Sequence, residues 1–300
     1  MDTPVNAVSR IDFSSGNTAA AKAALAKAGR AFEEHGCFVA LGMFAKLDLE
    51  PVRREIQRLI QLRRDQFCMP TEPETDAITR FDDGFLQMNR LDRTHGGVLY
   101  NACRRLVPVQ ALTVHPRLLE LSRELMKTRT LMESGATTVR IDHAREDTYL
   151  FPWHQDYPYI QDSLDGVVYW IPLQEVDESN GWLKCAVGSH KDGVVPVRVV
   201  DPKDEARNKA RNIEISDLKA PDRYSQVSVP LKEGDALVFS TLLLHCSQPN
   251  RSTRARWTVQ IRHGNFEHSH AVSKGWPGTM HQGYNFDQTH PEFVSNLEDL

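Results

Sequence analysis

The sequence predicts a mainly β protein in which packing helices precede an eight-stranded core of the jelly-roll type. From residue 132 onward, short apolar or β-branched runs alternate with turn residues, as in double-sheeted all-β folds. Before residue 132, apolar residues recur at helical spacing. The chain has 300 residues, of which 40% are hydrophobic, so it can build one large core. We expect one domain: a helical part (1–131), a β core (132–263) with an insertion (201–223), and a C-terminal extension (264–300).

The N-terminal part is predicted to contain three packing helices. Residues 19–34 are rich in alanine and are followed by Gly36, which indicates a helix with a glycine stop. Residues 37–41 then predict a short strand. Asp48 ahead of Pro51 favours a second helix that runs to about residue 64, and a third is expected to begin at Pro116.

The β core is predicted from eight short runs of strand-forming residues. They are residues 137–141, 149–153, 166–171, 182–187, 194–200, 227–229, 236–240 and 257–261. The charged segment 201–223 interrupts them. It could be an active-site lid, although a solvated insertion is the default interpretation.

Composition excludes several classes of partner. The formal net charge of -4 gives no general attraction to nucleic acid or to an acidic membrane surface. The five cysteines show neither zinc nor redox spacing, which favours reduced thiols in a cytoplasmic protein. The sequence shows neither an apolar signal core nor a run long enough to cross a bilayer. We expect a cytoplasmic monomer or homodimer whose partner is a small molecule.

Three residues indicate a metal site. His154 and Asp156 stand two apart after a β-favouring aromatic run, so on a strand both side chains would point the same way. His245 follows a long apolar run, where a metal would offset the desolvation of its ring. Two histidines and one carboxylate are the ligand set of oxygen-activating non-haem iron sites. The alternatives are a hydrogen-bonded His–Asp pair and a core histidine. A second copy of the motif, His190 and Asp192, lies between glycines and is interpreted as a turn.

Arg256 indicates an anion-binding group near that site. It stands eleven residues after His245 and opens a predicted buried strand. Because a guanidinium does not lose its charge in a protein, a buried arginine needs an anionic partner. A ligand that carries a carboxylate would supply one.

The ordered motifs of the chain resemble the phytanoyl-CoA dioxygenase family over about residues 41–263. They are His154-x-Asp156, Gly181-x-Leu183, Gly188-Ser189-His190-x-x-Gly193, Gly234-Asp235, Leu244-His245-x-Ser247, Asn250-x-Ser252 and Arg256. The resemblance implies a double-stranded β-helix of the cupin-like class and an oxygenase that depends on Fe(II) and 2-oxoglutarate.

The same resemblance assigns roles to individual positions. It makes His154, Asp156 and His245 the iron ligands. The cosubstrate 2-oxoglutarate is expected to contact four residues: Arg256 at its far carboxylate, Ser247 beside that arginine, Phe151 as a packing ring as in related ectoine hydroxylases, and Thr138 where relatives place an amide or lysine.

The implied reaction consumes O2, converts 2-oxoglutarate to succinate and carbon dioxide, and hydroxylates a small metabolite. Two alternatives stay open: the same iron site could catalyse desaturation, cyclisation or epimerisation, or the chain could be a non-enzymatic metal-binding β-barrel. The barrel would have no need of the carboxylate clamp at Arg256. Four residues are candidates for the prime substrate: Arg140, Gln87, Asn89 and Trp153.

Each substrate candidate has a structural alternative. Arg140 could form an ordinary salt bridge with Asp142 or Asp147, Gln87 and Asn89 could be solvated loop amides, and Trp153 could pack in the core. The C-terminal histidines are interpreted as scattered surface residues rather than a second metal site. They are His263, His268, His270 and His281.

Overall fold

The computed structural model describes residues 8–69, 80–200 and 213–295. Its largest element is a seven-stranded sheet in the order β1-β2-β10-β5-β12-β3, with β4 also paired to β12. We call it the major sheet. Its strands are β1 (Arg10–Asp12), β2 (Cys37–Leu41), β3 (Leu131–Glu133), β4 (Thr138–Asp142), β5 (Val167–Pro172), β10 (Ala236–Ser240) and β12 (Arg256–Asn265).

A three-stranded sheet, the minor sheet, packs on one face of the major sheet. Its strands are β11 (His245–Ser247), β6 (Leu183–Val187) and β9 (Ser225–Val229), in that order. Buried residues of both sheets form one apolar cluster, with Trp170 and Phe239 from the major sheet and Leu183 and Val227 from the minor sheet. A separate pair, β7 (Val197–Val199) and β8 (Ile213–Ile215), completes the strands of the described residues.

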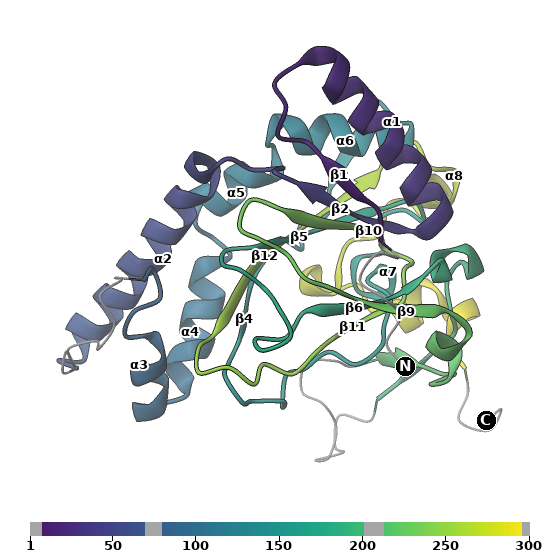
Figure 1. The fold of residues 1–300 in the computed structure, drawn as a ribbon. Coiled ribbons are helices and arrows are strands. Elements are labelled where there is room, and N and C mark those ends of the chain that lie inside the picture. The colour runs from purple at the N-terminus through teal and green to yellow at the C-terminus, as the bar shows by residue number, and fades with distance from the viewer. Residues whose placement is uncertain (1–7, 70–79, 201–212, 296–300) are drawn as a thin grey trace.

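Helices cover the other face of the major sheet (Figure 1). They are α1 (Thr18–His35), α2 (Lys46–Gln66), α3 (Phe85–Leu91), α4 (Thr94–Cys103), α5 (Val107–Thr113) and α6 (Pro116–Met126). The largest apolar cluster joins Phe32 of α1 and Leu121 of α6 to Tyr169, Trp257 and Val259 of the sheet. Three short helices come later: α7 (Tyr157–Ile160), α8 (Ser269–Ser273) and α9 (Phe286–Thr289).

Local sequence signals explain where α1 begins and ends. The side chain of Asn17 accepts hydrogen bonds from the backbone N–H groups of Ala19 and Ala20, which caps the first turn. Gly36 ends the helix at φ 72°, a left-handed conformation that glycine adopts without strain. The chain can therefore reverse directly into β2, which places α1 against the sheet.

Seven of the eight predicted core strands overlap an observed strand, but residues 149–153 do not form one. Pro152 interrupts that run, and its backbone carbonyl accepts a hydrogen bond from the ring of His154 instead of pairing with a strand. The sequence did not predict ten further elements: α3, α4, α5, α7, α8, α9, β1, β3, β8 and β11. β1 and β2 of the N-terminal part extend the major sheet beside β10.

The predicted insertion at 201–223 is only partly visible. Residues 201–212 lie outside the described residues. The remainder contains β8 and a 3-10 helix at Ala220–Arg223. No helix within the described residues has the length and apolar character that a membrane span requires.

Candidate metal centre

The three predicted ligands come together in the buried space between the two sheets. His154 and His245 face each other in an antiparallel bridge, in which each backbone N–H donates to the carbonyl of the other at 3.0 Å. Asp156 directly precedes α7. Its Oδ1 lies 3.4 Å from Nε2 of His154 and 3.7 Å from Nε2 of His245. One ligand atom of each residue lies within 4.8 Å of the others, and all three residues are buried.

Backbone carbonyls fix the orientation of both imidazoles. Nδ1 of His154 lies 2.8 Å from the carbonyl oxygen of Pro152, and Nδ1 of His245 lies 3.0 Å from that of Leu243. A carbonyl can only accept, so each Nδ1 donates to its carbonyl, and each Nε2 is the ring nitrogen that faces Asp156 and could bind a metal. Burial, reinforced by the neighbouring His154, lowers the pKa of His245 to about 3, so its ring is neutral.

Arg262 anchors the other oxygen of the Asp156 carboxylate. Its Nε donates to Oδ2 at 2.8 Å, its Nη1 donates to the carbonyl of Ala136 at 3.0 Å, and its Nη2 donates to Oε1 of Gln260 at 2.9 Å. Burial alone would raise the pKa of Asp156, but Arg262 and the two imidazoles together hold that pKa well below its usual range. Two imidazoles with Nε2 on the side of Asp156, and a carboxylate with one oxygen not bound by Arg262, are a suitable donor set for iron(II).

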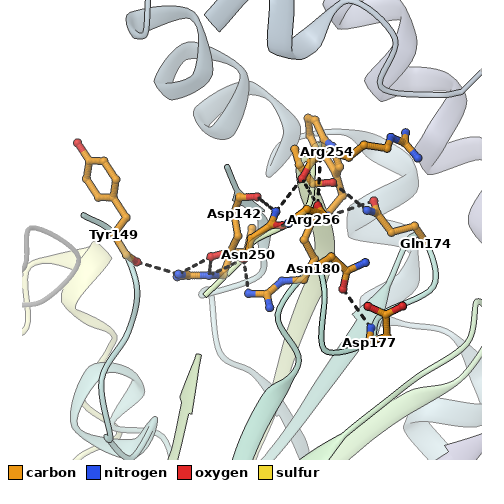
Figure 2. A network of polar contacts seen from close by, with 12 residues as sticks. Asp142, Tyr149, Gln174, Asp177, Asn180, Asn250, Arg254 and Arg256 are labelled. Carbon is orange, nitrogen blue, oxygen red and sulfur yellow. Dashed lines mark hydrogen bonds and ion pairs between the residues drawn. The ribbon is translucent and has the colours of Figure 1, made fainter. Parts of the chain in front are cut away.

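Arg256 is fully buried and only partly paired. Its Nη2 donates to Oδ2 of Asp142 at 2.7 Å, across the register in which β12 pairs with β4 (Figure 2). Its Nε and Nη1 are buried without a hydrogen-bond partner among the described residues. A buried donor without a partner is unfavourable, so this guanidinium suits a further anion. The far carboxylate of 2-oxoglutarate therefore fits the residues present.

Asp142 is shared by two arginines. Nε of Arg140 donates to its Oδ1 at 2.9 Å, while Arg256 donates to Oδ2. Burial works to raise the pKa of Asp142, but the two guanidinium groups outweigh it and lower the pKa to about 2. The salt bridge between Arg140 and Asp142, which was the expected alternative to a substrate-binding role, is therefore present.

A cavity of about 170 Å³ opens beside the ligands. The predicted site residues that line it are His154, Asp156, His245, Ser247, Phe151, Thr138 and Arg140. Arg256 is not a lining residue; its guanidinium carbon lies 5.5 Å from the ring centroid of Trp170, which does line the cavity. Tyr100, Gln260 and Arg262 also line it and were not foreseen. Arg262 had one sequence signal, because positions 256, 258, 260 and 262 share one face of a strand.

Three predicted substrate residues lie away from this cavity. Gln87 accepts a hydrogen bond from Nη2 of Arg64 at 3.4 Å, and Nδ2 of Asn89 donates to the carbonyl of Phe85 within α3 at 3.1 Å. Trp153 packs on an apolar cluster that contains Leu244. The structure places all three outside the residues that line the cavity.

The prediction that the C-terminal histidines are scattered on the surface is wrong for His263. It is buried, with Nδ1 at 2.7 Å from Oγ of Ser122 and Nε2 at 2.9 Å from the carbonyl of Thr113. Its place on β12 turns it toward the helices, which the sequence spacing did not reveal. His281 is exposed at the edge of the cavity. His190 of the second motif bonds the carbonyl of Glu33 at 3.1 Å, away from the three ligands.

Comparison with known proteins decides the family. The family model described as Phytanoyl-CoA dioxygenase (PhyH) matches residues 32–258. The chain belongs to the phytanoyl-CoA dioxygenase family. It is 26% identical over 231 residues to 1-deoxypentalenic acid 11-beta-hydroxylase of Streptomyces exfoliatus, covering 74% of each chain. It is 22% identical over 258 residues to peroxisomal phytanoyl-CoA dioxygenase of Rattus norvegicus, covering 81% of this chain and 69% of the relative.

Solved structures agree on the fold. The epimerase SnoN in complex with Fe3+, alpha ketoglutarate and nogalamycin RO gives a TM-score of 0.56 at 16% identity, covering 81% of this chain and 84% of that one. EctD from S. alaskensis with 2-oxoglutarate and 5-hydroxyectoine gives 0.51 at 15% identity, covering 80% and 76%. The predicted sheet-rich fold is thus confirmed. As a member of the phytanoyl-CoA dioxygenase family, the protein is a non-haem oxygenase that uses iron(II), 2-oxoglutarate and O2.

Proposed function

We propose that the protein hydroxylates a carbon atom of a small-molecule metabolite. Its balanced reaction takes the substrate, 2-oxoglutarate and O2 to the hydroxylated product, succinate and carbon dioxide. The observation that carries the proposal is the convergence of His154, Asp156 and His245 in one buried space. Arg256 supports it, because its Nε and Nη1 have no partner among the described residues and its guanidinium lies beside Trp170, which lines the cavity. The relative named for 11-beta-hydroxylation of 1-deoxypentalenic acid supports a small-molecule substrate.

Seven residues have a role in this proposal. His154, Asp156 and His245 hold the iron, which when bound couples the oxidation of 2-oxoglutarate to attack on a C–H bond. Arg256 and Ser247 orient the far carboxylate of the cosubstrate through charge-assisted hydrogen bonds. Phe151 and Thr138 pack along it. The facing sheets, which we interpret as a double-stranded β-helix, exclude water from this space.

The first experiment tests the binding of metal and cosubstrate without turnover. Anaerobic addition of iron(II) and then 2-oxoglutarate is expected to produce a visible charge-transfer band. H154A should abolish the band, because it removes a ligand atom. R256A should weaken 2-oxoglutarate binding at least about tenfold, because it removes charged donors to the far carboxylate.

Two matched variants act as controls. H190A removes the histidine of the second His-x-Asp motif, and R251A removes an exposed arginine that pairs with Asp147. Both should retain the band of the unchanged protein. A band that persists in H154A, or that never forms in the unchanged protein, would contradict the proposal. Analysis of the product then separates hydroxylation from desaturation, cyclisation and epimerisation at the same site.

A further inference from the structure

A second cavity of about 320 Å³ adjoins the metal site and is larger than the first, of about 170 Å³. Tyr100, Arg140 and Phe151 line both cavities, so these three residues form the boundary between them. The size of the second cavity falls in the range of small-molecule binding sites, about 300–1,000 Å³. A molecule in it would contact the same arginine that faces the iron ligands.

Arg140 is the arginine that lines both cavities. Its Nε and Nη2 are bound to Asp142, and Nη2 also donates to the carbonyl of Tyr149 at 2.8 Å. Its Nη1 makes no hydrogen bond to any residue in the described part of the chain. Arg93, the other arginine that lines this cavity, pairs with both carboxylate oxygens of Glu146 through Nε and Nη2 and does not line the cavity beside the iron ligands. Burial lowers the pKa of His143 to about 4, so that histidine is neutral.

Arg140 shares its counterion with a second arginine. Arg140 and Arg256 both pair with the carboxylate of Asp142, whereas Arg262 has the carboxylate of Asp156. Arg93 and Glu146, which also line the second cavity, pair with each other. Among the described residues, Arg140 therefore has no carboxylate of its own.

Three aromatic rings and Ile141 supply apolar surface in the second cavity. Tyr100, Tyr149 and Phe151 line it, with Arg140 lying 5.3 Å from the ring centroid of Phe151. Because Arg140 shares its carboxylate with Arg256, an anionic group that reaches Nη1 of Arg140 is stabilised. A ligand that suits both features has an apolar body and one negative charge.

The geometry points to a prime substrate that is a monocarboxylic acid with an apolar body. Its body occupies the second cavity, and its carboxylate accepts a hydrogen bond from Nη1 of Arg140 at the boundary with the metal site. This inference rests on the proposed function, because it assumes that 2-oxoglutarate occupies the first cavity and binds Arg256. It adds the chemical class of the substrate and the residue that recognises it.

The test uses simple acids as probes on protein that holds iron(II) and saturating 2-oxoglutarate, without oxygen. The probes are the phenylalkanoates from phenylacetate to 6-phenylhexanoate, each paired with its neutral primary amide. Calorimetry measures the dissociation constants. At least one acid should bind about tenfold or more tightly than its amide, because a charge-assisted hydrogen bond is lost in the amide. R140Q should remove this preference, R140K should retain part of it, and R251Q, an equal change of charge outside both cavities, should keep it.

Each outcome decides the inference. An absence of acid-over-amide preference along the whole series overturns it, even where R140Q does not fold. A preference that R140Q keeps in full overturns the role of Arg140. The charge-transfer band distinguishes a failure of the proposed function from a failure of the substrate class. If the band forms but the acids do not bind, the proposed function stands and only the substrate class fails; if the band does not form, the proposed function itself fails.

Discussion

The two carboxylate oxygens of Asp156 have different partners, which leaves one of them available to a metal. Arg262 occupies Oδ2, so Oδ1 alone faces the two imidazoles. Groups that orient a metal ligand in this way typically contribute about 10- to 100-fold to metal affinity. Arg262 is therefore a positioning residue rather than a ligand.

Replacing Arg262 tests that role. R262Q should weaken iron(II) binding about tenfold in anaerobic calorimetry, because Oδ2 loses its charged donor and the carboxylate is free to rotate. R262K keeps the charge but not the guanidinium's fixed donors, and it should fall between R262Q and the unchanged protein. Equal iron affinity in all three proteins would show that Arg262 has no positioning role.

The carboxylate of Asp142 is the shared counterion of Arg140 and Arg256. D142N should lower the free energy of unfolding by about 3 kcal/mol, because it leaves buried guanidinium groups without their counterion. It should also increase the rise in Tm caused by 2-oxoglutarate, since Arg256 then lacks a competing anion. Thermal unfolding with and without 2-oxoglutarate measures both effects. A smaller rise in D142N than in the unchanged protein would contradict the assignment of Arg256 to the cosubstrate.

At the scale of elements, the junction between α1 and β2 depends on a residue without a side chain. A Cβ built on Gly36 would lie 2.3 Å from Nδ1 of His190 and 2.9 Å from Cδ1 of Leu243. Gly188 provides a matched comparison, because its φ is also positive, at 89°, but a Cβ there would meet nothing within 4 Å.

Replacement of these two glycines by alanine should lower the free energy of unfolding by different amounts. G188A should lower the free energy of unfolding by about 1 kcal/mol, the strain of a left-handed residue that has a Cβ. G36A should lower it by roughly 1 kcal/mol more, because the new atom also displaces His190 and the buried Leu243. Denaturant unfolding of both variants measures the difference, and equal losses would show that the neighbours move aside freely.

Elements with a strong local signal could be predicted from the sequence. Asn17 and Gly36 mark the ends of α1, and Pro116 begins α6 as expected. The short helices α3, α4 and α5 could not be predicted, because each depends on packing against the sheet more than on its own periodicity. Residues 149–153 have strand propensity, but Pro152 and the carbonyl bond to His154 turn them into a loop.

The candidate site divides in the same way. His154, Asp156, His245 and Arg256 could be predicted because their ordered spacing carries the chemistry. Arg262 could not be assigned, because its partner Asp156 lies 106 positions away and only the finished fold brings them together. The shared use of Asp142 by two arginines likewise depends on the pairing of β4 with β12.

At the scale of the whole molecule, one sheet carries two different surfaces. The alternation of β12 sends Trp257, Val259 and Ile261 to the helices, and it sends Arg256 and Arg262 to the space between the sheets. His263 belongs to the first surface and ties the sheet to α5 and α6 through Thr113 and Ser122. Polar groups thus lie on both faces, and those on the helical face serve stability.

Buried histidines in distant parts of the fold make stability depend on pH. Burial lowers the pKa of His143, His263 and His290 to about 4, from an ordinary value of 6.5. Between these values the unfolded chain binds more protons than the folded one, so stability is full above about pH 6.5 and falls as the pH drops toward 4. For His263 the loss is on the order of 3 kcal/mol.

Denaturant unfolding from pH 7 to 4 should show this decline in the free energy of unfolding. The free energy of H263Q should decline less steeply, because the variant has no ring to protonate at this position. Identical slopes for the two proteins would mean that His263 is protonated in the folded state as easily as in the unfolded chain.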